Sequence, residues 1–139
     1  MSSHLNPRAS LPRRQSDAWG SGAFGASRGS RTHRGTDFAC YPGTLIYPIK
    51  PGRVSKLGYT YSDDLSFRYV EITDSRGFRC RYFYIEPEVV EDQSVGLYTV
   101  LGATQKLGDR YPDITEHTHI EVYRPNGGLL DPDKYMDDA

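Results

Sequence analysis

The sequence predicts a mainly β protein: a single domain of antiparallel strands, arranged as a sandwich or a barrel, with little helix. A chain of 139 residues has the size of one domain. Tyrosine occurs 11 times, tryptophan once and methionine twice, and glycine and proline interrupt many short segments, which is typical of strands and turns. No stretch has apolar residues at helical spacing over three turns, and only 132–136 is compatible with a helical turn.

The first 18 residues are predicted to form a basic, flexible tail. Residues 1–34 contain six arginines and one acidic residue, and 1–18 has too few apolar side chains to offset the entropy of ordering. Such a tail is either a plain extension or an arm that binds a partner surface, for instance wall polymer or another protein. Composition therefore places the folded domain at 19–139 and predicts that removal of the tail leaves thermal stability unchanged.

Short strands account for the rest of the chain. Strands are predicted over 44–47 and 52–58, and the alternating segment 68–73 is expected to form a β-hairpin with 78–85. Because side chains alternate along a strand, 78–85 is expected to present two faces. These are Phe78, Cys80, Tyr82 and Tyr84 on one side and Arg79, Arg81, Phe83 and Ile85 on the other. Strands over 95–101 and 117–123 complete the sheet.

Composition also excludes several classes of protein. No run of eighteen apolar residues occurs and the mean hydropathy is −0.64, so no membrane span is expected. The net charge is −1, and no nucleic-acid partner is expected. Cys40 and Cys80 lack the C-x-x-C spacing of metal and redox sites, so both are predicted to be small buried hydrophobic residues. The first thirty residues lack the apolar core of about seven residues that a secretory signal peptide requires, so export by that route is not expected.

Three of the four histidines lie in two short segments that also carry an aspartate. His33 and Asp37 are four residues apart, which in a straight strand is about 13 Å, too far to share an ion with ligand bonds of about 2 Å. The chain must therefore curl between them, and Gly35 at the midpoint permits a close approach of the backbone. His117 and His119 are two residues apart, so in a strand both side chains point to one face.

These motifs resemble those of the lysostaphin-type zinc endopeptidases, which cut the peptides of bacterial peptidoglycan. The similarity extends from about Trp19 to Met136. It includes Gly22-Ala23-Phe24-Gly25, Arg28, His33-Arg34-Gly35-Thr36-Asp37-Phe38, Gly43-Thr44-Leu45-Ile46-Tyr47-Pro48, His117-Thr118-His119-Ile120-Glu121-Val122 and Asn126-Gly127-Gly128-Leu129-Leu130-Asp131-Pro132. It implies a β domain of the duplicated-hybrid-motif type, and a groove that Phe24 and Tyr111 could flank.

The resemblance also implies a metal site and a reaction. His33, Asp37 and His119 would bind one zinc ion, and His117 would act as the general base. The partners would be peptidoglycan peptides, and the place of action the bacterial wall or periplasm. Without a signal peptide, a phage virion component or an enzyme released on lysis is expected, with the tail able to bind other virion or tail proteins.

One position departs from the family pattern. Tyr82-Phe83-Tyr84-Ile85 stands where the family has a strand with one further histidine, and Tyr84 takes the place of that histidine. A tyrosine hydroxyl can donate a hydrogen bond to an oxyanion but does not act as a base near neutral pH. Two functions therefore remain open: an active zinc endopeptidase, or a weak or inactive metal-binding relative with a structural or wall-binding role, for instance in a phage tail. A sugar-transport regulatory domain of the same β architecture would leave Asp37 without a role.

Overall fold

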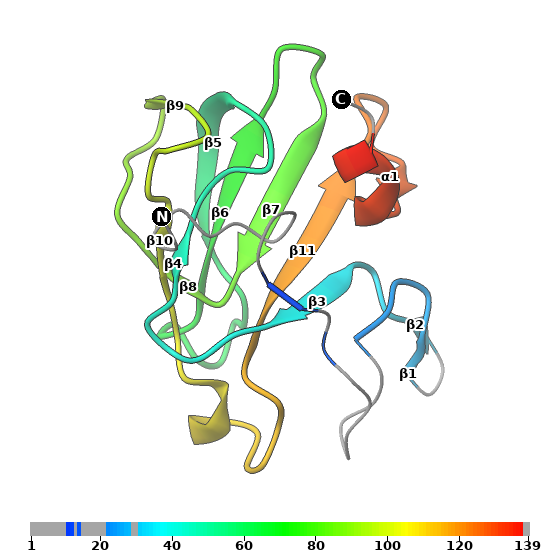
Figure 1. Ribbon diagram of the computed structural model, residues 1–139, viewed down its shortest axis with the longest axis vertical. Coiled ribbons are helices and arrows are strands. Elements are labelled where there is room, and N and C mark those ends of the chain that lie inside the picture. Colours follow the sequence, from blue (N-terminus) through cyan, green and yellow to red (C-terminus); the bar gives the residue numbers. More distant parts are fainter. Residues whose placement is uncertain (1–10, 13, 15–21, 29–30, 138–139) are drawn as a thin grey trace.

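The computed structural model describes residues 11–12, 14, 22–28 and 31–137, and it consists almost entirely of antiparallel strands (Figure 1). Over these residues the strands form a seven-stranded sheet, a three-stranded sheet and a two-stranded hairpin. Helical segments in the described ranges are limited to η1 (Leu107–Asp109) and α1 (Pro132–Asp137). The predicted mainly β, antiparallel fold with little helix is confirmed, and the described strands close no barrel.

The seven-stranded sheet forms the central part of the molecule. Its strand order is β12 (Leu129–Leu130), β11 (His117–Tyr123), β7 (Arg79–Phe83), β6 (Arg68–Thr73), β5 (Gly52–Tyr59) and β9 (Ser94–Val95). Strand β11 pairs with β12 near its carboxyl end and with β3 (Thr36–Ala39) near its amino end. This pairing brings β3, which is distant in sequence, beside the His-x-His segment (Figure 1).

The core lies between the large sheet and the small one. The small sheet has the order β4 (Leu45–Ile46), β10 (Gly102–Thr104) and β8 (Ile85–Pro87), and β1 (Ser27–Arg28) pairs with β2 (Arg31–Thr32) in the hairpin. Ile46, Val70, Tyr82 and Ile120 belong to one cluster of buried side chains that spans both sheets. Helix α1 adds Tyr135 to this cluster.

Strands β6 and β11 have the bounds that the sequence predicts, whereas the strand predicted over 95–101 is wrong. That stretch begins in β9 of the large sheet and ends just before β10 of the small sheet. A turn separates the two, in which the Thr99 N–H donates to the Gly96 carbonyl (3.1 Å) and the Gly96 N–H to the Thr99 hydroxyl (2.9 Å). The chain therefore changes sheets where its alternation suggested one strand.

The predicted alternation of 78–85 holds only as far as Phe83. Tyr84 has a φ of 67°, a left-handed conformation that is uncommon for a residue with a side chain. Its N–H donates to the Arg68 carbonyl (2.8 Å), and its carbonyl accepts from the Gln105 N–H (2.8 Å), so this conformation is held on both sides. As a result Ile85 enters the core, instead of sharing the face of Phe83, and Tyr84 leaves it.

Neither cysteine forms a disulfide. Cys80 is fully buried and Cys40 half-buried, so the prediction of a buried residue is confirmed for Cys80 and only partly met by Cys40. Burial raises the pKa of the Cys80 thiol to about 12 and that of Cys40 to about 11, which leaves both thiols protonated near neutral pH. No helix in the described part of the chain is long and apolar enough to cross a membrane.

Three residues of the segment predicted as a tail are described, and all three contact the domain. Leu11 packs against the core, and the Pro12 carbonyl accepts a hydrogen bond from the Ala39 N–H (2.7 Å). The Arg14 N–H donates to the Asp37 carbonyl (2.9 Å), and its guanidinium is buried. The other residues of 1–18 lie outside the described ranges, so the boundary after Ala18 stays a prediction.

These contacts change the expected result of removing the tail. Deletion of 1–18 removes the guanidinium that faces the Asp37 carboxylate, and we now expect the midpoint of thermal unfolding to fall by roughly 5 °C. Deletion of 1–10 is the matched control, because it keeps Leu11, Pro12 and Arg14. Differential scanning calorimetry of both proteins measures the difference, and equal midpoints would show that these contacts contribute no stability.

Candidate metal and catalytic site

The pairing of β3 with β11 builds the site. In this register Asp37 lies opposite His119 and Ala39 opposite His117. The chain bends at Gly35, where an added Cβ would lie 2.0 Å from the Ile120 carbonyl oxygen and 2.9 Å from Cε1 of His119. Glycine is therefore required for the backbone to pass close to β11, and the bend brings His33 back toward Asp37.

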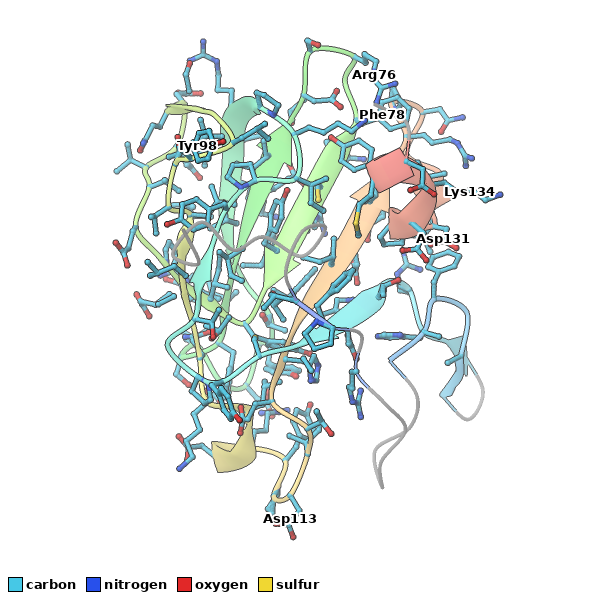
Figure 2. The ribbon with its side chains drawn as sticks, viewed as in Figure 1. Arg76, Phe78, Tyr98, Asp113, Asp131 and Lys134 are labelled. Carbon is cyan, nitrogen blue, oxygen red and sulfur yellow. The ribbon has the colours of Figure 1, made fainter. Side chains whose placement is uncertain are left out.

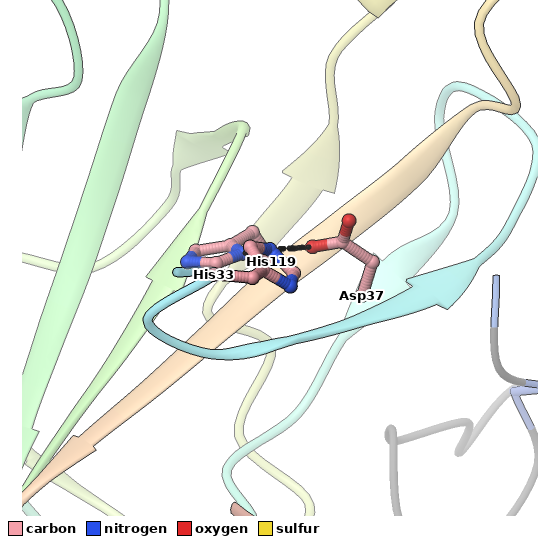
Figure 3. Close-up of side chains that lie close together, drawn as sticks. All are labelled: His33, Asp37 and His119. Carbon is pink, nitrogen blue, oxygen red and sulfur yellow. Dashed lines mark hydrogen bonds and ion pairs between the residues drawn. The ribbon is translucent and has the colours of Figure 1, made fainter. Parts of the chain in front are cut away.

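Three side-chain atoms converge where the sequence predicts metal ligands (Figure 3). Nε2 of His33 lies 3.0 Å from Nδ1 of His119 and 3.2 Å from Oδ1 of Asp37. Nδ1 of His119 lies 2.7 Å from the same carboxylate oxygen. Ligands at about 2 Å from a tetrahedral zinc ion are about 3.3 Å from one another, so the spacing of the three atoms fits a single ion.

The outer nitrogen of each ligand histidine is bound to an acceptor. Nδ1 of His33 lies 3.0 Å from the Ala23 carbonyl oxygen, and Nε2 of His119 lies 2.9 Å from Oε2 of Glu121. These acceptors require a proton on the nitrogen that they contact, so in a neutral ring, the form that binds metal, the inner nitrogen would present its lone pair to the common point. Such outer partners are the usual means of orienting a metal-binding histidine.

Asp37 is buried and ionised. Burial disfavours its charge, but the hydrogen bond from His119 and the charge of that ring outweigh this effect and lower the pKa of Asp37 well below its usual range. Its second oxygen, Oδ2, accepts a hydrogen bond from Nη1 of Arg14 at 2.8 Å. The guanidinium holds Oδ2, which leaves Oδ1 directed at the two histidines.

His119 carries a positive charge when no metal is bound. Burial alone would lower the pKa of His119. The hydrogen bonds to Asp37 and Glu121 outweigh that effect and raise the pKa to about 9. Glu121 in turn accepts a hydrogen bond from the Tyr123 hydroxyl, and the Arg34 guanidinium contacts that hydroxyl at 3.5 Å. A metal ion would replace the proton on Nδ1 of His119 while Nε2 keeps its partner.

The metal-free protein should therefore lose stability as the pH rises from about 6.5 to about 9. The pKa of His119 is raised on folding. Its contribution to the free energy of unfolding is therefore complete below the pKa of the unfolded chain, and it is lost as the pH rises through the pKa of the folded protein. One proton is involved, which limits the slope to about 1.4 kcal/mol per pH unit. Urea denaturation of EDTA-treated protein across this range measures it. A His119→Gln protein is the control and should lack the decline; an identical decline in that protein would assign the effect to another group.

His117 occupies the same face of β11 but has a different environment. Its Nδ1 lies 2.7 Å from the Thr115 carbonyl oxygen and so carries the proton, which leaves Nε2 basic, 3.4 Å from Oδ2 of Asp37. Burial lowers the pKa of His117, although the charge of Asp37 opposes this. The ring is therefore neutral near pH 7 and able to accept a proton.

Tyr84 lies across from these histidines. Its ring meets the His117 ring edge-on, with centroids 5.6 Å apart, and its hydroxyl is 3.2 Å from that of Tyr61. Burial raises the pKa of Tyr84 to about 12, so the hydroxyl stays protonated and can donate a hydrogen bond. The left-handed backbone conformation is what turns this side chain out of the core and toward the site.

The three histidines line one open cleft of about 450 Å³ together with Asp37, Arg14, Glu121 and Tyr84. Its wall includes Tyr61, Tyr84 and Tyr111, and the loop after η1 that carries Tyr111 extends to Asp113 at the lower end of the molecule (Figure 2). Tyr111 thus flanks the groove as the sequence suggests. Phe24, the other aromatic residue expected there, is half-buried and is not part of the lining.

Several residues of the site were not predicted from the sequence. Glu121 and Tyr123 continue the two-residue spacing of His117 and His119, so strand alternation could have placed all four on one face. Arg14 and Tyr61 carry no such signal, because each reaches the cleft from a separate segment through the fold.

Comparison with known proteins assigns the chain to a family. Residues 31–132 match the model for peptidase family M23. The chain belongs to this family. Family M23 consists of peptidoglycan-acting metallopeptidases, and the matched region contains His33, Asp37, His117 and His119. The resemblance drawn from the sequence motifs is thereby confirmed at the level of the family.

Similar proteins include a mammalian one and several bacterial ones. Mouse leukocyte cell-derived chemotaxin-2 is 29% identical over 123 residues, which cover 88% of this chain and 78% of that protein. Lysostaphin from Staphylococcus simulans has a similar structure, with a TM-score of 0.69 and 17% identity over 91% of this M23 chain. The chain spans about half the length of lysostaphin, 49%.

A second structure matches over nearly its whole length. The catalytic domain of EnpA, a prophage-encoded M23 protein from Enterococcus faecalis, has a TM-score of 0.66 and 21% identity, with 91% of this chain and 92% of that domain covered. At this level of identity the two structural matches establish the fold, and the family model carries the assignment.

Proposed function

We propose that this M23 protein is a zinc-dependent endopeptidase that hydrolyses the cross-links or stem peptides of bacterial peptidoglycan. The observation that carries the proposal is the convergence of His33, Asp37 and His119 on one point in an open cleft, beside the basic nitrogen of His117. Two imidazoles and one carboxylate are the ligand set of a catalytic zinc site, in which one position stays available to water.

The side chains supply the remaining parts of the reaction. When bound, zinc polarises a carbonyl group and lowers the pKa of water to about 7. Nε2 of His117 takes the proton of the attacking water and returns it to the leaving amine. Tyr84 donates a hydrogen bond to the oxygen on which negative charge develops. Arg14 and Glu121 keep Asp37 and His119 in position.

This function implies where the protein acts. Its partners would be peptidoglycan peptides in the bacterial wall or periplasm, reached as a component of a phage virion or after lysis. In that setting the basic segment 1–18 would bind other virion or tail proteins.

A second function is favoured by Tyr84 and by the name of one relative. On the sequence resemblance Tyr84 stands where the family has a further histidine, and the mouse relative is named as a chemotaxin, not as a peptidase. On this alternative the protein binds the metal but is weakly active or inactive, and serves a structural or wall-binding role, for instance in a phage tail.

Zymography on purified cell walls, with zinc analysis of the same sample, separates the two functions. Cleared bands together with about one zinc ion per chain support the endopeptidase, and bound zinc without clearing supports the alternative. Mass spectrometry of the released muropeptides then identifies the bond that is cut. Heat-treated protein and protein stripped of metal are the controls.

A further inference from the structure

Three tyrosine hydroxyls meet in the wall of the cleft. The Tyr111 hydroxyl donates to that of Tyr61 at 2.8 Å, and the Tyr61 and Tyr84 hydroxyls lie 3.2 Å apart. The three residues come from the loop after η1, the loop after β5 and the break between β7 and β8. Their rings also contact one another, with the Tyr61 centroid 6.3 Å from that of Tyr111 and 6.4 Å from that of Tyr84.

Arg110 lies at the outer end of this row of three hydroxyls, next to Tyr111. Nε of Arg110 donates to the Tyr111 hydroxyl at 3.2 Å, and the guanidinium lies over the Tyr61 ring, 3.8 Å from its centroid. Asp63 and Asp64 hold the other guanidinium nitrogens, at 3.4 and 3.7 Å. These contacts fix Arg110 with Nε directed at Tyr111.

The proton count favours one direction for the three hydroxyls. A guanidinium can only donate, and each tyrosine hydroxyl has one proton to give. The Tyr111 oxygen therefore accepts from Arg110, and the Tyr111 proton goes to Tyr61. By distance alone either hydroxyl of the Tyr61–Tyr84 pair could be the donor; because the Tyr61 oxygen already accepts from Tyr111, its own proton is available to Tyr84.

When Tyr61 is the donor, Tyr84 has its proton left for the cleft. Among the described residues its hydroxyl has only Tyr61 as a hydrogen-bond partner, and it lines the same cavity as Asp37, His117 and His119. Hydrogen bonds arranged in series polarise one another, so each hydroxyl in the chain becomes a better donor.

We propose that Arg110, Tyr111 and Tyr61 form a one-way hydrogen-bond chain that points the Tyr84 proton at the developing oxyanion. These three are positioning residues, because they act through Tyr84 and do not touch the reacting atoms. The inference rests on the proposed peptidase function for its purpose, but the direction of the chain is a property of the protein alone.

A measurement without metal or substrate tests the direction. The C–O bond of a phenol weakens when its oxygen accepts a hydrogen bond and strengthens when its hydroxyl donates one. Tyr84 is labelled with ¹³C at Cζ, and its C–O stretch is compared by infrared difference spectroscopy in wild-type and Tyr61→Phe protein. Tyr61→Phe keeps the ring and removes the hydroxyl.

The sign of the shift decides the outcome. If Tyr84 accepts from Tyr61, the stretch rises to higher frequency in Tyr61→Phe; a fall would show that Tyr84 donates to Tyr61, and no shift would show that the two do not interact. Either of these results overturns the proposal. Tyr111→Phe should shift the stretch in the same direction by less, and it decides the matter if Tyr61→Phe does not fold.

Kinetics test the purpose of the chain. Tyr61→Phe should lower kcat by about 10-fold, the effect of one weakened hydrogen bond, with KM and zinc content unchanged. Tyr59→Phe is the matched control, because Tyr59 is exposed on β5, outside the cleft lining, and it should keep wild-type kcat. An unchanged kcat in Tyr61→Phe would overturn the catalytic role. If wild-type protein hydrolyses no peptide, the proposed function fails while the infrared result still decides the direction.

Discussion

We expect His33→Ala, Asp37→Asn and His119→Ala each to weaken zinc binding by at least about 100-fold, because each removes one of three protein ligands. His33→Ala is the cleanest of the three, since His33 is the least buried of the three residues and its loss leaves the Arg14–Asp37 ion pair in place. His119→Ala also leaves Glu121 without its partner and should lower stability as well. Zinc analysis of dialysed protein measures the binding.

His117→Ala is the control within the same site. It should keep full zinc occupancy and lose activity by roughly 10² to 10⁴, the contribution of a general base. Full zinc occupancy in His119→Ala would contradict the assignment, because it would mean that the ligand and the base are exchanged or that the metal lies elsewhere.

The second large effect is expected at Tyr84. Tyr84→Phe removes a preorganised donor to the developing oxyanion and keeps the ring, so the rate constant for cleavage should fall by roughly 10². The φ of 67° suits phenylalanine no worse than tyrosine, so the fold should be retained. Zinc content should not change. Single-turnover kinetics on a defined muropeptide measure the rate.

Tyr84→His tests the position from the other side. Histidine is among the residues that tolerate the left-handed conformation, and an imidazole at this position would match the histidine that the sequence resemblance implies there. Activity should be retained or raised. Cleavage by Tyr84→Phe at the wild-type rate would show that Tyr84 only fills space, and that zinc and His117 carry the reaction without it.

Much of the fold could be predicted because it depends on local pattern. Alternation over 68–73 and 117–123 marks strands with two faces, and both have the predicted bounds. The prediction failed over 95–101, where a turn hidden in an alternating segment sends the chain into another sheet. The prediction also failed at Ile85, because no local sequence pattern indicates that Tyr84, the residue before it, has a left-handed conformation.

The histidines and Asp37 were identifiable as candidate ligands because zinc restricts its ligands to few residue types at short range. Residue type and spacing therefore marked His33, Asp37, His117 and His119 as candidates, and the resemblance of their motifs to a known family indicated the family. What depends on the tertiary structure is how these groups are held. Arg14 reaches Asp37 across 23 residues of sequence, and Tyr61 reaches Tyr84 across 23 as well. Such contacts depend on which strands pair and where loops meet. The packing of the whole chain decides both, so the residues between the two partners carry no local pattern that predicts the contact.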